Sequence, residues 1–298
     1  DNIKTSFLCG AFCVDDFSFK GNPIKMSLDG VAIPATSSFK STKRTQTYEK
    51  TNLKEIGQKV AERAGIALFY EAKEMTIEKV EQNDQDDCSF YNSLVTKYGL
   101  AMKIFNDKIV IFDEATYEQK PTIATLTEKD FDPNWSWNTS LAGTYTGVKY
   151  EYTNSKKNKT FTVEAGDGDR ILTCNEAAEN LTEATAIALA ALNSANKGTT
   201  TLNITLKGRW YIFATACVQI VGLGQLSGKY YVEKAIHTLG DSGYKTALKL
   251  RKVEERITEV KTQSSTVAER SKSKKSSSSK KSSSSSSSTP SKGDTYEL

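Results

Sequence analysis

The sequence has few of the residues that disulfide frameworks, metal centres and catalytic histidines require. Among 298 residues there is one histidine, and there are five scattered cysteines, namely Cys9, Cys13, Cys88, Cys174 and Cys217. An odd number of scattered cysteines does not suit a disulfide framework in a chain of this length. Cys9 and Cys13 could begin a metal site, but no second Cys/His pair follows at ligand spacing. We therefore expect free, buried thiols in a protein made in a reducing cytoplasm.

Long apolar runs are also missing. No stretch approaches the roughly 18 consecutive apolar residues of a membrane-spanning helix, so the sequence predicts no membrane span. The first residues, Asp1-Asn2-Ile3-Lys4, include neither an initiator methionine nor an apolar signal core. We expect that an upstream segment was removed or that the numbering starts inside a longer polypeptide.

The charge is confined to one end of the chain. Seven basic and three acidic residues follow from Ser264 onward, which accounts for the whole net charge of +4. The rest of the chain is neutral, which argues against a nucleic-acid-binding face. Half of the 28 residues in Ser271–Leu298 are serine, and serine offers little apolar area to offset the entropy of ordering. Residues 259–298 are therefore predicted to be a disordered Ser/Lys-rich tail without packed structure beyond Val260.

Residues 45–118 predict an αβ module. Asn52 can cap a helix that Gly65 ends, and Asp86 can cap a second helix that Gly99 ends. A hairpin with its turn at Asn106-Asp107 follows these helices. Strand-like segments lie between them, and no polar cluster in the module suggests a reaction site.

Residues 119–258 predict a second, mainly β unit. A long Ala-rich helix is expected from about Glu176 to Ala195, with Gly198 just past its end. Strands are expected around it at residues 144–152, 160–163, 201–206, 217–221, 230–237 and 245–250.

Two segments of the chain are alike. Gly10-Ala-Phe-Cys-Val-Asp15 matches Gly228-Lys-Tyr-Tyr-Val-Glu233 in its pattern of small, aromatic, valine and acidic residues, and Lys25–Leu28 matches Lys245–Leu248. This similarity suggests two equivalent hairpins in separate sheets. Phe12 and Val14 should then share one face, as Tyr230 and Val232 should in the second hairpin. Cys13, Tyr231 and the acids Asp15 and Glu233 are then expected on the other face.

The second of these segments carries a resemblance to a known family. Gly228–His237 with Ser242–Leu250 resembles the closing hairpin of the phage late-control protein D family, the baseplate hub of contractile tails. Asn175-Glu-Ala-Ala with the Ala-rich helix, Gly208 and Val221-Gly-Leu-Gly224 is similar to the preceding part of that domain. Gly30–Pro34, Asn52–Ile56 and Ala61–Gly65 are similar to the family's middle region. Together these segments cover roughly residues 8–254.

The resemblance implies an α+β, mainly β fold. It implies two related small antiparallel β-barrels, with residues 1–44 as the remainder of the first, residues 45–118 inserted between them, and residues 119–258 as the second barrel with one long helix. Roughly the first half of the first barrel is expected to precede residue 1.

The resemblance also implies a function. The family forms a homotrimeric ring that joins the tail tube protein to the central spike protein and contacts other baseplate proteins. The expected location is the baseplate of a virion, a defective prophage particle or a tail-like bacteriocin, assembled after synthesis in the bacterial cytoplasm.

An enzyme is the first alternative, as a Cys/His hydrolase. His237 lies in a predicted strand with Glu233 four residues earlier, which alternation places on the same face, but no nucleophile elbow, phosphate loop or metalloprotease motif accompanies it. The acidic group Glu81, Asp84, Asp86 and Asp87 does not fit an EF-hand loop and is interpreted as a solvated turn with a helix cap. We predict no catalytic, cofactor-binding or metal-binding residues and no enzyme.

A ring-forming secretion or envelope protein is the second alternative. Residues 52–112 also resemble the small αβ modules of secretins and TonB-dependent receptors. Those proteins continue into membrane barrels behind a signal peptide, and neither feature is visible in this sequence.

Overall fold

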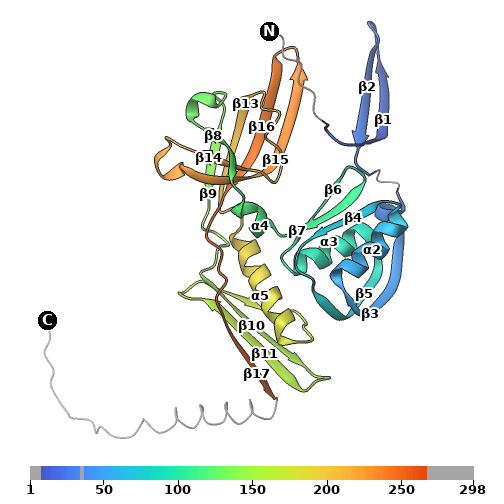
Figure 1. The fold of residues 1–298 in the computed structure, drawn as a ribbon, viewed down its shortest axis with the longest axis vertical. Helices are drawn as coiled ribbons and strands as arrows, with labels where there is room; N and C mark the ends of the chain where they lie inside the picture. Colours follow the sequence, from blue (N-terminus) through green and yellow to red (C-terminus); the bar gives the residue numbers. More distant parts are fainter. Residues whose placement is uncertain (1–7, 34–36, 267–298) are drawn as a thin grey trace, which may run out of the picture.

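A computed structural model describes residues 8–33 and 37–266 of the protein (Figure 1). Strands predominate and helices are few, which confirms the α+β, mainly β class. The strands form a separate hairpin, the two sheets of the αβ module, and two larger sheets from the second half of the chain.

The αβ module follows the predicted order. The two predicted helices are α2 (Leu53–Ala64) and α3 (Asp87–Lys97), and a short helix that was not predicted, α1 (Ser38–Ser41), precedes them. One antiparallel pair joins β3 (Lys43–Asn52) to β5 (Thr76–Asp86), and a three-stranded sheet has the order β4 (Ala67–Glu71), β7 (Lys108–Phe112), β6 (Ala101–Phe105).

Local capping explains where α2 and α3 begin and where α2 ends. The Asn52 side chain accepts a hydrogen bond from the Glu55 amide at 2.8 Å, and Asp86 accepts one from the Ser89 amide at 2.8 Å. Gly65 ends α2 in the left-handed conformation with φ 69°, which glycine adopts without a side-chain clash. The predicted caps are confirmed.

The second half of the chain contributes two sheets. A four-stranded sheet has the order β12 (Ile171–Cys174), β10 (Gly147–Asn154), β11 (Lys159–Gly166), β17 (Val260–Thr266). A six-stranded sheet has the order β8 (Thr122–Leu126), β14 (Cys217–Ile220), β15 (Gly228–Gly240), β16 (Gly243–Lys252), β13 (Thr200–Lys207), β9 (Ser136–Thr139). Its ladder ends at β8 and β9 within the described residues, so closure into a barrel is not seen.

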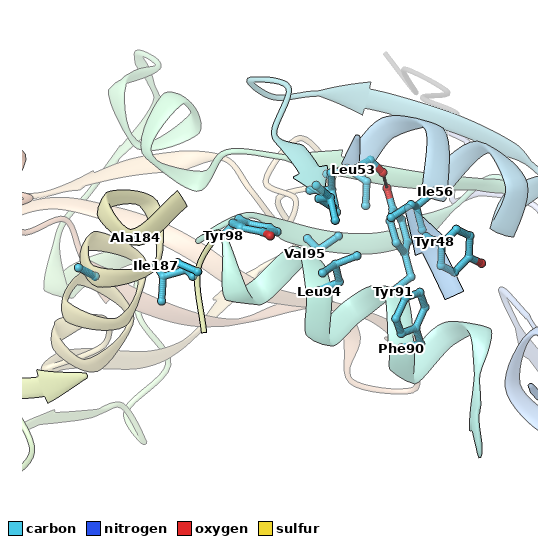
Figure 2. Packing of buried hydrophobic residues seen from close by; sticks show 14 of the residues in the cluster. Tyr48, Leu53, Ile56, Phe90, Tyr91, Leu94, Val95, Tyr98, Ala184 and Ile187 are labelled. Carbon is cyan, nitrogen blue, oxygen red and sulfur yellow. Dashed lines mark hydrogen bonds between the residues drawn. The ribbon is translucent and has the colours of Figure 1, made fainter. Parts of the chain in front are cut away.

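Two apolar cores divide the molecule differently from the predicted units. The first core joins the αβ module to the four-stranded sheet and to α5 (Leu181–Asn196). Figure 2 shows Tyr98 of the αβ module pointing toward Ile187 and Ala184 of α5. The second core lies on one face of the six-stranded sheet alone. The long helix therefore packs with the four-stranded sheet and the inserted module, and not with the six-stranded sheet.

Helix α5 begins later than the sequence indicated. It starts at Leu181 because the Asn180 side chain accepts a hydrogen bond from the Glu183 amide at 2.8 Å. Asparagine is a preferred residue at this capping position.

Strand β17 corrects the expectation that nothing packs beyond Val260. Residues Val260–Thr266 pair with β11 along its whole length, from Ala165 opposite Val260 to Lys159 opposite Thr266. Val260 also packs against the first core. The other residues of β17 are polar, so their side chains add little apolar burial. Backbone hydrogen bonds to the edge of β11 therefore explain why this segment forms a strand. The remainder of the predicted tail, residues 267–298, lies outside the described residues.

Two truncations test the role of β17. Ending the chain after Thr266 should leave the urea unfolding midpoint close to that of the full chain. Ending it after Glu259 should lower the free energy of unfolding by about 1–2 kcal/mol, because it removes the ladder hydrogen bonds and the Val260 contact. Equal midpoints for the two truncations would show that β17 adds no stability.

A buried charge cluster joins the module to the sheets. Helix α4 (Glu114–Gln119) carries Glu118, which is 5% exposed. Its carboxylate lies 2.5 Å from Nη2 of Arg251 in β16 and accepts hydrogen bonds from Nε and Nη2 of Arg256 at 2.7 and 2.8 Å. Lys197, which follows α5, pairs with Glu114 at 2.6 Å. Segments from three parts of the fold therefore meet at α4.

Candidate interaction surface

The hairpin formed by β1 (Cys13–Lys20) and β2 (Lys25–Val31) stands apart from the body (Figure 1). Its two strands pair only with each other among the described residues, so both outer edges carry unpaired backbone groups there. Both strands are almost entirely exposed. An isolated two-stranded hairpin is at best marginally stable in water, so this element needs a further contact.

The hairpin has one apolar face. Cross-strand partners share a face of a sheet, and the rungs Phe17–Leu28 and Phe19–Met26 alternate with Ser18–Ser27 and Lys20–Lys25. Val14 joins the apolar side opposite Gly30, and Phe12 lies two residues before it. The side chains of this face are between 52% and 64% exposed: Phe12, Val14, Phe17, Phe19, Met26 and Leu28. We call these six residues the apolar hairpin face.

The same pairing recurs in β15 and β16. In the first hairpin Val14 faces Gly30 and Asp16 faces Asp29, which leaves Asp15 as the extra residue of a bulge. In the second, Val232 faces Leu250 and Lys234 faces Lys249, which leaves Glu233 as the extra residue. The two hairpins lie in different sheets and match without a register shift, so the predicted equivalence of the hairpins is confirmed.

A pair of glycines supports this equivalence. Gly10 has φ 125° and Gly228 has φ 145°, and each lies four residues before the valine that precedes the bulge. Residues that carry a side chain rarely adopt this backbone conformation, so both positions favour glycine.

The second hairpin shows how such a face is buried. Tyr230 and Val232 are fully buried in the second core, as the alternation predicts. Tyr231 lies on the opposite face under the Arg251 guanidinium, 4.3 Å from its ring centre, and Glu233 pairs with Arg251 at 3.5 Å on that face. The predicted faces are confirmed for this copy. The apolar hairpin face is its uncovered counterpart, and it is the candidate interaction surface of the chain.

Alanine substitutions at the two equivalent valines distinguish the buried face of the second hairpin from the exposed face of the first. Val232→Ala should lower the free energy of unfolding of the chain by about 1–3 kcal/mol, because it leaves a cavity in the second core. Val14→Ala, at the equivalent but exposed position, should change it by less than about 0.5 kcal/mol. Chemical unfolding of both variants checks this, and a large loss for Val14→Ala would mean that the face is already covered.

His237 lies within hydrogen-bonding distance of two side chains of the neighbouring strand β16. Its Nδ1 lies 2.8 Å from the Tyr244 hydroxyl and 3.3 Å from Oγ1 of Thr246, its cross-strand neighbour. Glu233 lies on the opposite face, contrary to the expectation from simple alternation, because the bulge at Glu233 reverses the order of faces along β15. The histidine and this acid therefore form no acid–base pair.

The predicted acidic turn is only partly solvated. Asp86 caps α3, and Asp84 pairs with Lys43 at the surface. Asp87 is a correction, because it is 1% exposed and accepts hydrogen bonds from both Arg63 and Arg44, at 2.7 Å and 3.2 Å. Burial opposes ionisation of Asp87, but the hydrogen bonds from Arg63 and Gln82 outweigh it and lower the pKa of the carboxyl group.

This carboxylate predicts a pH dependence. Because the folded-state pKa of Asp87 is lowered, its stabilisation is complete above the unfolded-state pKa of about 3.9 and is lost as the pH falls through the folded-state value. Urea midpoints measured from pH 7 down to pH 3 should therefore fall more steeply for the natural chain than for Asp87→Asn. Parallel curves for the two proteins would contradict this assignment.

The cysteines are free but not all buried. Cys217 is buried, and burial raises the pKa of its thiol. Cys88 and Cys174 are half-buried, while Cys9 and Cys13 are exposed, which corrects the expectation of buried thiols. Cys13 is the first residue of the exposed strand β1, and Cys9 lies four residues before it.

The other predicted motifs make no site in the described residues. Val221-Gly-Leu-Gly224 leads into a single 3-10 turn at Gly224–Leu226 and not into a helix that could hold a phosphate. Within residues 8–33 and 37–266, no three His, Cys, Asp or Glu side chains are placed to share a metal ion. In the same part of the chain, no helix combines the length and apolarity needed to cross a membrane.

Several solved structures resemble this chain at low sequence identity. No protein-family model and no curated protein matches it. A tail protein from Neisseria meningitidis superposes with a TM-score of 0.65 at 14% identity, covering 82% of this chain and 80% of that one. The 43 kDa tail protein of prophage MuSo2 from Shewanella oneidensis gives 0.63 at 12% identity, over 80% and 77% of the two chains. Prophage tail protein gp18 from Listeria monocytogenes gives 0.53 at 10% identity, over 82% and 78%. The chain thus has the fold of phage tail proteins along most of its length.

Proposed function

We propose that this chain is a structural, non-enzymatic baseplate hub protein of a contractile phage tail or a phage-tail-like particle, where it joins the tail tube to the central spike. The likeness to prophage tail proteins over about four fifths of the chain supports a role in a tail. The resemblance of Gly228–Leu250 to the late-control protein D hairpin supports the hub in particular.

The observation that carries the proposal is the pair of equivalent hairpins. Each chain holds two copies of one bulged hairpin in different sheets. A homotrimer would therefore present six equivalent units to a sixfold tail tube, while its other side keeps threefold symmetry for the spike. In this proposal residues 1–44 belong to a first small barrel, residues 45–118 are inserted, and the six-stranded sheet belongs to a second barrel.

The proposed partners are the tail tube protein, the central spike protein and other baseplate proteins. The apolar hairpin face would be covered in the assembled baseplate, which removes an exposed patch that a free chain would carry. The proposed location is the particle itself, after synthesis in the bacterial cytoplasm.

Deletion of the gene from a complete tail gene cluster tests this function. We expect cells to produce tail tubes or sheaths without a spike, and the natural chain supplied from a plasmid should restore complete particles. A plasmid copy with His237→Ala should restore them equally well, because no catalytic step is proposed. Complete, spiked particles in the absence of the gene would overturn the proposal.

A further inference from the structure

The two equivalent hairpins carry like-charge pairs of opposite sign at the same rung. Asp16 lies directly opposite Asp29, immediately after the first bulge. At the corresponding rung after the second bulge, Lys234 lies directly opposite Lys249. Like charges directly opposite on neighbouring strands are destabilising, so each hairpin carries an unfavourable pair that an opposite pair would relieve.

Each pair is only weakly compensated inside the chain. All four side chains belong to exposed residues. Lys249 pairs with Glu233 at 3.1 Å, whereas neither aspartate nor Lys234 makes an ion pair with any described residue. Asp15, the exposed bulge residue beside Asp16, adds a third acid to the first hairpin.

The surface around the lysine pair is hollowed. A depression of about 200 Å³ is lined by Lys234, Lys249, Ile236 and Ala247, with Asn203 and Thr205 of the neighbouring strand β13. Ile236 is 47% exposed there. The lysines thus flank a partly apolar hollow, which a strand with acidic side chains could enter.

The hairpins point toward the same end of the molecule (Figure 1). A rotation about an axis along this direction can place the first hairpin of one copy beside the second hairpin of the next. Such a contact is head-to-tail, and it forms a closed ring when the rotation is a whole fraction of a full turn without a shift along the axis.

We propose that the Asp16–Asp29 pair of one copy docks against the Lys234–Lys249 pair of the next copy, and that this contact fixes the order of subunits around the ring. The occupant of the hollow is therefore a second copy of this chain. This inference rests on the proposed ring-forming function and names the contact that would build it. Exposed ion pairs each contribute about 0.2–1 kcal/mol, so the four charges set the order and orientation of the subunits and do not by themselves hold the ring together.

Charge reversal tests the contact in tails purified from cells with a complete tail gene cluster. The variants D16K/D29K and K234D/K249D each place like charges against like charges between copies, while the like-charge rung inside each hairpin is kept. Each should reduce the number of hub copies per tail at least tenfold, with thermal midpoints near that of the natural chain because the sites are exposed. The quadruple variant should restore the natural number.

The outcomes separate the contact from the function. If the natural chain is absent from tails, the proposed function fails. If it is present and both reversals are neutral, or both fail and the quadruple variant does not restore incorporation, the docking proposal is wrong while the function stands.

Co-expression of the two reversal variants adds a test of the subunit number. A D16K/D29K chain can contact a K234D/K249D chain on both sides, but only a ring with an even number of subunits can alternate them. A threefold ring always leaves one like-charged contact, so the mixture should rescue it less than the quadruple variant does. Equal rescue by both would keep the contact and contradict the trimer.

Discussion

Replacing Glu118 with glutamine should lower the free energy of unfolding by about 1.5–3 kcal/mol, which is the range for hydrogen bonds to charged groups. Arg251 is 3% exposed and lies 2.5 Å from this carboxylate, and Arg256 donates two hydrogen bonds to it. Glutamine keeps the shape but not the charge, so Arg256 loses its ion-pair partner, whereas Arg251 keeps Glu114 and Glu233 at 3.6 and 3.5 Å. Chemical unfolding at neutral pH measures the loss.

The matched control is Asp84→Asn. Asp84 pairs with Lys43 at 3.0 Å, but the two side chains are 79% and 64% exposed, so the change should cost less than about 1 kcal/mol. A cost below 1 kcal/mol for Glu118→Gln as well would show that water reaches the cluster and that α4 is not the junction of the fold.

Replacing Gly57 with alanine should destabilise the chain by about 2–4 kcal/mol, although alanine is the better helix former. Within a helix, alanine gains about 1 kcal/mol over glycine. However, a Cβ at Gly57 would lie 2.0 Å from the Tyr91 hydroxyl. That tyrosine is fully buried and donates a hydrogen bond to the Leu53 carbonyl at 3.0 Å (Figure 2). Overpacking and loss of a buried hydrogen bond each cost about 1–3 kcal/mol, and together they outweigh the gain in propensity.

The control for this change is Gln58→Ala, one residue further along α2. Gln58 is exposed, so its replacement should shift the thermal midpoint little. A higher midpoint for Gly57→Ala than for the natural chain would contradict the close packing of α2 on α3.

Local signals in the sequence were sufficient to predict α2, α3 and the two equivalent hairpins. Asn52, Asp86 and Gly65 act on the backbone within a few residues of themselves, so their effect could be predicted without knowledge of the fold. The register of the two hairpins was predictable for a similar reason, since alternation and matching residue types place Val14 and Val232 on equivalent faces.

Features that depend on distant contacts could not be predicted in this way. Strand β17 has a polar sequence, and the edge of β11 that it completes lies about a hundred residues earlier. The bulge at Glu233 shifts the faces of β15, so a rule of simple alternation gave the wrong side for Glu233 relative to His237. The sharing of one core between α5 and the αβ module likewise arises only once the chain has folded.

The exposure of the apolar hairpin face was the feature of the candidate site that was hardest to predict from the sequence. Its alternation was visible in the sequence, and alternation normally indicates that the apolar side is buried. Only the placement of the hairpin outside both cores shows that this side is uncovered among the described residues.

The most direct test of the account is the number and position of copies of this chain in an intact particle. Electron-microscopic averaging of tails that carry a small tag on the chain should find three copies in one ring, between the end of the tail tube and the spike, with six hairpins facing the tube. Six copies at that level, or copies repeated along the tube, would contradict the proposal that two equivalent hairpins per chain let a threefold hub meet a sixfold tube.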